Sequence, residues 1–208
     1  EFADAEHGVI AKALNAIAKA LARGDRDLAF NKLLPAALEY LDRHLTHEER
    51  VLENAILYWA EEKGLGDELE SFYQSFRRYL RLKGKSENDY SYKDFLEFSY
   101  ETGFTDSPLF KLVDLLEHQK KGHAAVKNQL LEELSKINPE EEPKRILAEL
   151  GLAVSFVLNR VLKLDKKYVD FYKRYGIPAC GEKPLLPPPE VLRLVEKVLK
   201  EEERKTET

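Results

Sequence analysis

The sequence predicts an all-α protein built around an antiparallel four-helix bundle. Apolar residues recur three and four positions apart over long stretches, which is the spacing of one helix face. Glycine and proline stand where these stretches end. No stretch shows the strict alternation of apolar and polar residues that is typical of a half-buried strand. With 208 residues, of which 43% are hydrophobic, the chain is long enough to bury a sizeable core.

Four long amphipathic stretches account for the predicted bundle. Short joints connect them, which favours antiparallel neighbours. Pro35 lies inside the second stretch and is expected to bend it. The expected helices cover residues 3–23, 27–63, 108–135 and, starting at Pro139 or Pro143, a stretch that runs to 175.

An aromatic-rich helical insert, at about residues 65–107, separates the second and third bundle helices. It is expected to hold two shorter helices, 67–82 and 92–102. Its aromatic rings favour a second core layer, with a partner-docking surface as the alternative. A proline-rich linker then leads to a last helix. The expected organisation is a bundle domain over residues 1–176 and a C-terminal tail over 177–208.

Charge and composition exclude several classes of protein. A net charge of −5 with mixed signs argues against a nucleic-acid binder. No apolar run is long enough to span a bilayer, and no signal-peptide pattern opens the chain. A single cysteine, Cys180, excludes an internal disulfide. A cytoplasmic location is the expectation.

A carboxylate interrupts the apolar stripe of the second long helix. Glu48 stands where a leucine is expected, and His44 lies one turn before it on the same face. A buried charge is usually paired, protonated or bound to a metal. The H-x-x-x-E spacing therefore makes His44 and Glu48 a candidate metal half-site.

Three further side chains of ligand type fall on inward stripes of the other helices: His7, His118 and Asp165. Imidazole and carboxylate together suit iron, zinc or manganese. For any single histidine, the alternative is a core residue bonded to a backbone carbonyl. For the carboxylates, the alternative is an ion pair with lysine or arginine. The coincidence across helices favours a metal site.

The two remaining histidines are interpreted differently. His123 follows His118 by five residues, so it can join the same site only if a π-bulge, which Gly122 would permit, distorts the helix. His47 lies with Tyr40 and charged neighbours, so we interpret it as a surface residue. We accordingly expect Glu48→Ala to abolish metal binding and His47→Ala to leave it intact.

Three segments resemble the hemerythrin and HHE cation-binding family: EHGVIAKALNAIAKAL, RHLTHEERVLENAI and LLEHQKKGHAAVKNQLLEEL. The resemblance implies a four-helix bundle that holds two bridged irons through five histidines, one glutamate and one aspartate. By position it assigns ligand roles to His7, His44, Glu48 and His118. Asp165 would match the aspartate that closes the fourth-helix motif.

Two positions depart from the family pattern. Arg160 stands where the fourth helix of the family carries a histidine, and Gly122 stands where its third helix carries a second one. The full set of seven ligands is therefore absent at standard spacing. A one-metal site, a two-metal site completed by Glu49, a tyrosine or water, and a decayed site all stay open.

Three functions follow from these observations. The first is a hemerythrin-like protein that binds iron, with manganese or zinc as alternatives, and senses, stores or carries O2, NO or a related small oxidant. The second, a ferritin-like oxidase, is disfavoured because no E-x-x-H pair is present. The third is a metal-free helical interaction protein that docks a protein partner or a second copy of itself. No pattern supports nucleophilic catalysis, which favours a binding protein over an enzyme.

Overall fold

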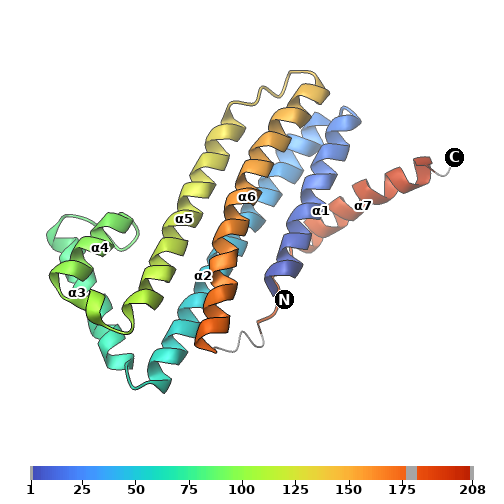
Figure 1. Ribbon diagram of the computed structural model, residues 1–208. Helices are drawn as coiled ribbons and strands as arrows, with labels where there is room; N and C mark the ends of the chain where they lie inside the picture. The colour runs from blue at the N-terminus through green and yellow to red at the C-terminus, as the bar shows by residue number, and fades with distance from the viewer. Residues whose placement is uncertain (1, 177–181, 207–208) are drawn as a thin grey trace. The chain divides into compact units, whose positions relative to one another are not determined.

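The computed structural model describes residues 2–176 and 182–206, and every named element among them is helical (Figure 1). No ladder of strands occurs in these two ranges, which contain a single isolated bridge between Ser86 and Asp89. The prediction of an all-α protein is confirmed. Cys180 lies outside the described residues. In chain order the elements are α1 (Phe2–Ala22), the π-helix η1 (Leu28–Leu33), α2 (Leu34–Glu62), α3 (Gly66–Leu82), α4 (Tyr92–Glu101), the 3-10 helix η2 (Phe104–Asp106), α5 (Phe110–Ser135), α6 (Pro143–Tyr175) and α7 (Pro189–Thr206).

The expected helix ends differ from the observed ones at prolines. The second long helix opens with η1 and continues without a break into α2, so Pro35 lies inside a continuous helix, directly after the π-helical turns. α5 begins at Phe110, two residues after Pro108. Of the two prolines expected to begin the fourth long helix, Pro143 does so.

Contacts divide the chain into two compact units, which are described separately. The first unit comprises Glu1–Glu48, Val126–Val161 and Gly181–Thr208, and the second comprises Glu49–Ala125 and Leu162–Cys180. This division groups α7 with α1, whereas the sequence suggested a boundary at residue 177. None of the described helices combines the length and the apolarity that crossing a lipid bilayer requires.

Alanines of α1 allow close packing in the first unit. Ala16 and Ala20 are fully buried beside Ile17 and Leu21, and α1 contacts both η1 and α7. Arg23, directly after α1, forms an ion pair with α7, with its Nη1 2.7 Å from Glu201 Oε2. The core comprises two groups, one of Ala13, Ala16, Ile17, Ala20, Leu21, Ala29, Leu33, Ala37, Ile146, Leu150, Val195 and Val198, and one of Val126, Leu130, Ala153, Val157 and Val161.

Aromatic rings dominate the core of the second unit. Phe72 stacks on Phe104 with ring centroids 3.8 Å apart, and Phe95 is fully buried. These rings pack with aliphatic residues of α2 and α5, among them Leu52 and Leu112, as the core interpretation of the insert expects. Large buried rings supply much apolar area each, so they stabilise this unit strongly.

A capping box begins α4 after the turn-rich segment. The Ser91 hydroxyl accepts from the Asp94 backbone N–H, and the Asp94 carboxylate accepts from the Ser91 backbone N–H. Lys85 Nζ adds an ion pair 2.7 Å from Asp94 Oδ2. Burial alone would raise the pKa of Asp94, but the hydrogen bonds from Lys85 and Ser91 outweigh it and lower this pKa to about 2.

Candidate metal centre

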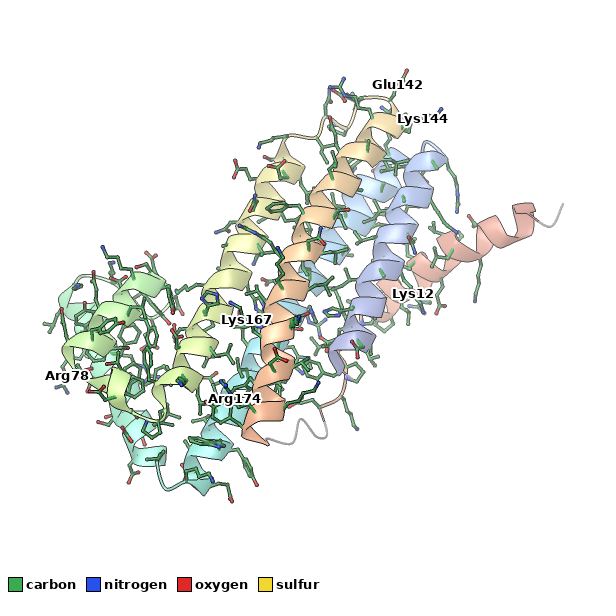
Figure 2. The ribbon with its side chains drawn as sticks, in the orientation of Figure 1. Lys12, Arg78, Glu142, Lys144, Lys167 and Arg174 are labelled. Atoms are coloured by element: carbon green, nitrogen blue, oxygen red, sulfur yellow. The ribbon has the colours of Figure 1, made fainter. Side chains whose placement is uncertain are left out.

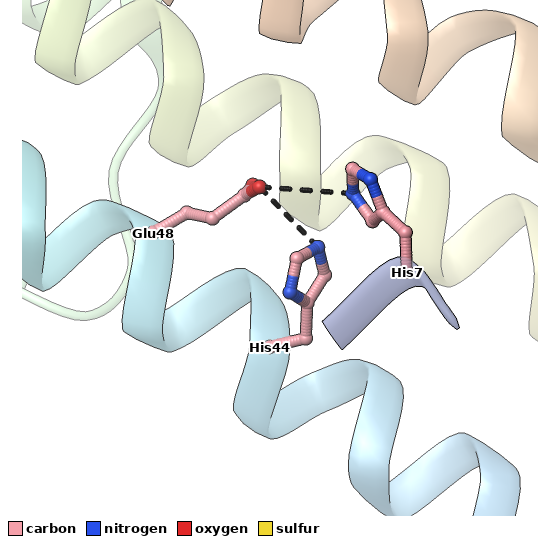
Figure 3. Close-up of side chains that lie close together, drawn as sticks. All are labelled: His7, His44 and Glu48. Carbon is pink, nitrogen blue, oxygen red and sulfur yellow. Dashed lines mark ion pairs between the residues drawn. The ribbon is translucent and has the colours of Figure 1, made fainter. Parts of the chain in front are cut away.

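Two imidazoles and a carboxylate from α1 and α2 converge in the first unit (Figure 3). Oε1 of Glu48 lies 3.3 Å from Nε2 of His44 and 3.9 Å from Nε2 of His7. All three residues offer a ligand atom within 4.8 Å of the other two. Among the described residues this is the one group of three or more side chains with such a convergence.

Helix periodicity explains how α2 supplies two of the three donors. His44 and Glu48 are four residues apart, so both project from one face of the helix. His44 is fully buried and Glu48 is 3% exposed, which confirms that this face points inward. His7 approaches from the first turns of α1, with 31% of its side chain exposed. The Nε2 atom of His7 that faces Glu48 is nevertheless buried, so the exposed part of the ring lies away from the centre.

The spacing of these atoms suits a transition metal. Neighbouring ligands of an ion with bonds of about 2.1 Å lie roughly 3.0–3.4 Å apart. The His44–Glu48 separation of 3.3 Å already meets this requirement. The His7–Glu48 separation of 3.9 Å needs a movement of about half an ångström, which a side chain at the surface can make. Imidazole and carboxylate donors together fit iron, manganese and zinc.

A second carboxylate, Glu6, fixes the orientation of His44. Its side chain is fully buried, and its Oε1 lies 3.2 Å from Nδ1 of His44. When Nδ1–H donates to this carboxylate, Nε2 of His44 is left as the lone-pair nitrogen that faces Glu48. Metal-binding histidines commonly have an orienting partner of this kind. Glu6 is the residue of this candidate centre that the sequence interpretation missed.

His47 is buried, so its interpretation as a surface residue was wrong. It is 4% exposed, and its Nδ1 lies 2.8 Å from Oε2 of Glu6. Its Nε2 lies 3.2 Å from Oε2 of Glu182, in the segment before α7. His47 is buried because the segment before α7 packs over this side of α2.

Tyr40 belongs to the same covered flank. Its hydroxyl donates to the backbone carbonyl of Leu185 at 2.7 Å, and the residue is 5% exposed. Burial, and then the negative charge of Glu6, raise the pKa of Tyr40 to about 12. The phenol therefore stays protonated and keeps its hydrogen bond over the ordinary pH range.

A sequence signal for Glu6 and His47 did exist. Glu6 lies seven residues before Ala13, and Ala13 belongs to the run of small residues that marks the most buried face of α1. His47 lies seven residues after Tyr40 and four before Val51, and both of these are buried. The buried face of each helix is wider than the single stripe on which the prediction relied.

The other three predicted ligands lie in the second unit. His118 is half-buried and lines an open cavity of about 700 Å³. Lys167 and Arg174 of α6, which Figure 2 labels, line the same cavity. Its Nε2 lies 3.4 Å from Lys167 Nζ, and its ring meets Tyr92 edge-on. The surroundings of His118 within this unit thus combine aromatic rings with both cationic and acidic side chains, Asp114 and Asp170 among them.

His123 and Asp165 have different surroundings. Nδ1 of His123 lies 3.0 Å from Oε1 of Glu49, and His123 is 2% exposed. α5 is α-helical throughout, so the π-bulge that would align His123 with His118 is not observed. Asp165 is a half-buried residue of α6.

Arg160 does not bring its charge into the interior of the first unit. It is exposed, and its Nη1 donates to Oε1 of Gln129 at 2.8 Å. Its guanidinium also lies over the ring of Phe156. The repulsion that an inward arginine would exert on a metal ion is therefore absent at this position.

A small apolar cavity adjoins the two imidazoles. Its volume is about 60 Å³, and His7 and His44 line it together with aliphatic side chains from α1, α2, α5 and α6. Leu14, Leu41 and Val157 are among these. Such a space favours small apolar molecules over ions or large substrates.

Comparisons with known proteins found no match to a family model, to a curated protein or to a solved structure.

Proposed function

We propose that this chain is a hemerythrin-like metal-binding protein that holds iron, with manganese or zinc as alternatives, at His7, His44 and Glu48. The observation that carries the proposal is the convergence of Glu48 Oε1 on the two Nε2 atoms, at 3.3 and 3.9 Å. A cytoplasmic location is part of the same proposal.

The fold that belongs to this proposal is an antiparallel bundle of α1, α2, α5 and α6. The α3–α4 region is then the insert, and α7 is the tail. The apolar groups of the first unit support it, because they draw residues from all four bundle helices. The hemerythrin-like arrangement stays an inference from these cores and from the three sequence segments.

Each member of the centre has a distinct role in this proposal. Glu48 supplies charge balance and an oxygen ligand. His7 and His44 supply neutral nitrogen ligands, and Glu6 fixes the tautomer of His44. An iron ion held by so few protein ligands keeps open coordination positions, at which a small oxidant such as O2 or NO can bind. His118, His123 and Asp165 stay predictions as further ligands, and the metal stoichiometry of their alanine variants tests each one.

The neighbouring apolar cavity supports a diatomic ligand. Its volume of about 60 Å³ suits a molecule of two or three heavy atoms, and its walls offer no polar groups other than the two imidazoles. A protein of this design would carry, store or sense the small molecule.

The decisive experiment is metal analysis of protein purified without added metal, followed by reconstitution with Fe(II). We expect one or two bound ions per chain. Glu48→Gln, which preserves shape and removes charge, should weaken binding by more than about 100-fold, beyond the range that orienting partners produce. Glu39→Gln, an exposed site on the same helix, is the matched control. Absence of metal and of uptake in the native protein would refute the proposal.

A second measurement addresses the small molecule. The iron-loaded protein should gain a visible absorption band on exposure to air that disappears when oxygen is removed. Iron binding without any oxygen-dependent or NO-dependent spectral change would retain the metal centre and reject the carrier function.

The second candidate function is a metal-free helical interaction protein. The contacts of Glu6 with His44 and His47 favour it, since imidazoles that become protonated can balance the buried carboxylates without a metal. In that case chelators leave the melting temperature unchanged. The metal-binding proposal expects chelators to lower it, because a ligand of the folded state stabilises that state.

A further inference from the structure

The second unit contains a cavity with a buried carboxylate. Its volume is about 500 Å³, and it lies between α2, α3, α5 and the loop that follows α3. Glu117 of α5 lines it and is fully buried. Tyr73 and Tyr90 line the same cavity. None of these residues belongs to the candidate metal centre.

Glu117 uses only one of its two carboxylate oxygens. The Tyr90 hydroxyl donates to Oε2. Oε1 is buried and has no hydrogen-bond partner within the described part of the chain. The Tyr73 hydroxyl is also buried and likewise lacks a partner there. Because buried polar atoms are nearly always bonded, two such atoms on residues that line one cavity indicate that hydrogen-bond partners are missing there.

The charge of the lining determines what kind of donor fits. Arg77 Nε is 3.2 Å from Glu87 Oε1, so this pair is internally balanced. Lys120 then faces the remaining acids, Glu53 and Glu117 among them. Five glutamates and two basic residues line the cavity in total: Glu53, Glu61, Glu70, Glu87 and Glu117 against Arg77 and Lys120. A cationic donor is favoured over a neutral or anionic one.

The apolar side chains of the cavity wall indicate that the ligand also has an apolar part. Leu69, Phe76, Leu80 and Leu116 line the cavity and are almost fully buried. A metal ion is disfavoured, because Glu117 belongs to no converging group of three His, Cys, Asp or Glu side chains in the described ranges. A cation that carries its own apolar body fits both the acid and the walls.

The same region already binds one ammonium group. Lys121 Nζ lies 3.6 Å from the centroid of the Tyr90 ring. Ammonium groups are attracted to the faces of aromatic rings, and the attraction grows when water is excluded. Burial also raises the pKa of Glu117, and the hydrogen bond from Tyr90 and the charges of Lys120 and Lys121 offset this rise only in part. An ammonium ligand beside Oε1 would supply that compensation.

We propose that this cavity is a binding site for a small primary amine with an apolar body. Its ammonium group donates to Oε1 of Glu117 and to the phenol oxygen of Tyr73, and its body packs against Phe76 and the neighbouring leucines. The site is independent of the metal proposed above.

The test compares benzylamine with benzyl alcohol, which has nearly the same shape without the charge. Calorimetric titration into the full chain, with chelator present, should show saturable binding of benzylamine and at least about tenfold weaker binding of the alcohol. Glu117→Gln should weaken benzylamine binding at least about tenfold. Glu97→Gln, at a site on α4 outside the cavity whose side chain is 40% exposed, should leave it unchanged.

The Tyr73→Phe variant tests ligand binding without disturbing the fold. The variant removes only a hydroxyl that makes no hydrogen bond in the described structure, so it should fold normally and bind benzylamine several-fold more weakly. Equal affinity for amine and alcohol overturns the proposal, as does no binding at about 10 mM amine. If Glu117→Gln fails to fold, the comparison of the two probes on the native chain and on Tyr73→Phe still decides.

Discussion

Both units of the molecule bury glutamates, but they satisfy them with different donors. In the first unit Glu6 meets imidazole nitrogens of His44 and His47. In the second unit Glu117 meets the single hydroxyl of Tyr90. An imidazole has two nitrogens and can link two carboxylates, whereas a phenol has one O–H group. The same buried residue type therefore builds a connected network in one unit and leaves an open acceptor in the other.

This difference determines which ligand each region suits. The imidazoles of the first unit can be neutral donors to a metal or cations that balance Glu6 and Glu48. Around Glu117 the nearest compensating charges belong to Lys120 and Lys121, and burial raises its pKa. The first region therefore suits a metal ion, and the second suits a ligand that brings its own charge.

Within this comparison, the largest change in metal affinity is expected when Glu6 can no longer accept from His44 and His47. Glu6→Gln should weaken Co(II) or Fe(II) binding by about 10- to 100-fold, the range reported for partners that orient a ligand. The Co(II) visible spectrum should also change, because His44 loses the carboxylate that fixes its ring. Glu6→Asp, which keeps the charge, should recover part of the affinity. Unchanged affinity and spectrum in Glu6→Gln would assign Glu6 a purely structural role.

The next effect concerns the pH dependence of the second unit. The pKa of Glu117 is raised in the folded state, so the folded protein holds its proton more tightly than the unfolded chain. The free energy of unfolding should therefore fall as the pH rises above about 4.5, by up to about 1.4 kcal/mol for each pH unit between the two pKa values.

Glu117→Gln removes this proton and provides the comparison. Its free energy of unfolding, measured with urea from pH 4 to 8, should lack the fall assigned to Glu117 and should exceed that of the native protein at pH 7. A native-like pH profile in the variant would contradict the assignment of this dependence to Glu117. Glu97→Gln serves here as the control as well.

The smallest effect concerns the capping box of α4. Ser91→Ala should lower the free energy of unfolding by about 1 kcal/mol, the usual contribution of a helix cap. Ser75→Ala, at an exposed position inside α3, should change it by less than half as much. Equal effects of the two variants would contradict the stabilising role of the cap.

The Asp94 carboxylate of that box provides a pH test with the opposite sign. Its pKa is lowered to about 2 in the folded state, below its ordinary value of 3.8. Its contribution is therefore fully present above about pH 4 and is lost as the pH falls toward 2. In Asp94→Asn this loss should be absent from an acid titration followed by circular dichroism.

Much of the fold could be predicted because helix periodicity is a local property. The long ranges of α1, α5 and α6 follow from apolar spacing and from the glycines and prolines around them. The sequence predicts a bend at Pro35, and the π-helical η1 directly precedes this proline, but i→i+5 hydrogen bonding has no sequence pattern of its own. The grouping of α7 with α1 likewise depends on contacts between residues far apart in the sequence.

The candidate site could be predicted only in part for a similar reason. His44 and Glu48 share a helix, so their spacing alone indicates that they meet. His7 was placed by its stripe and by the family resemblance. Glu6 and His47 were missed because the prediction relied on a single stripe of each helix, whereas the buried faces of α1 and α2 are wider than that stripe. The burial of Glu117 could not be predicted either, because residues of α3, which is far from Glu117 in the sequence, form part of the cavity around it.

The contact between His47 and Glu182 also has a consequence for synthesis of the chain. The two residues are 135 positions apart. On the ribosome, His7, His44 and Glu48 are all made long before Glu182 and α7 exist. A nascent chain that stops short of residue 182 thus carries every donor of the trio while its outer flank is still uncovered.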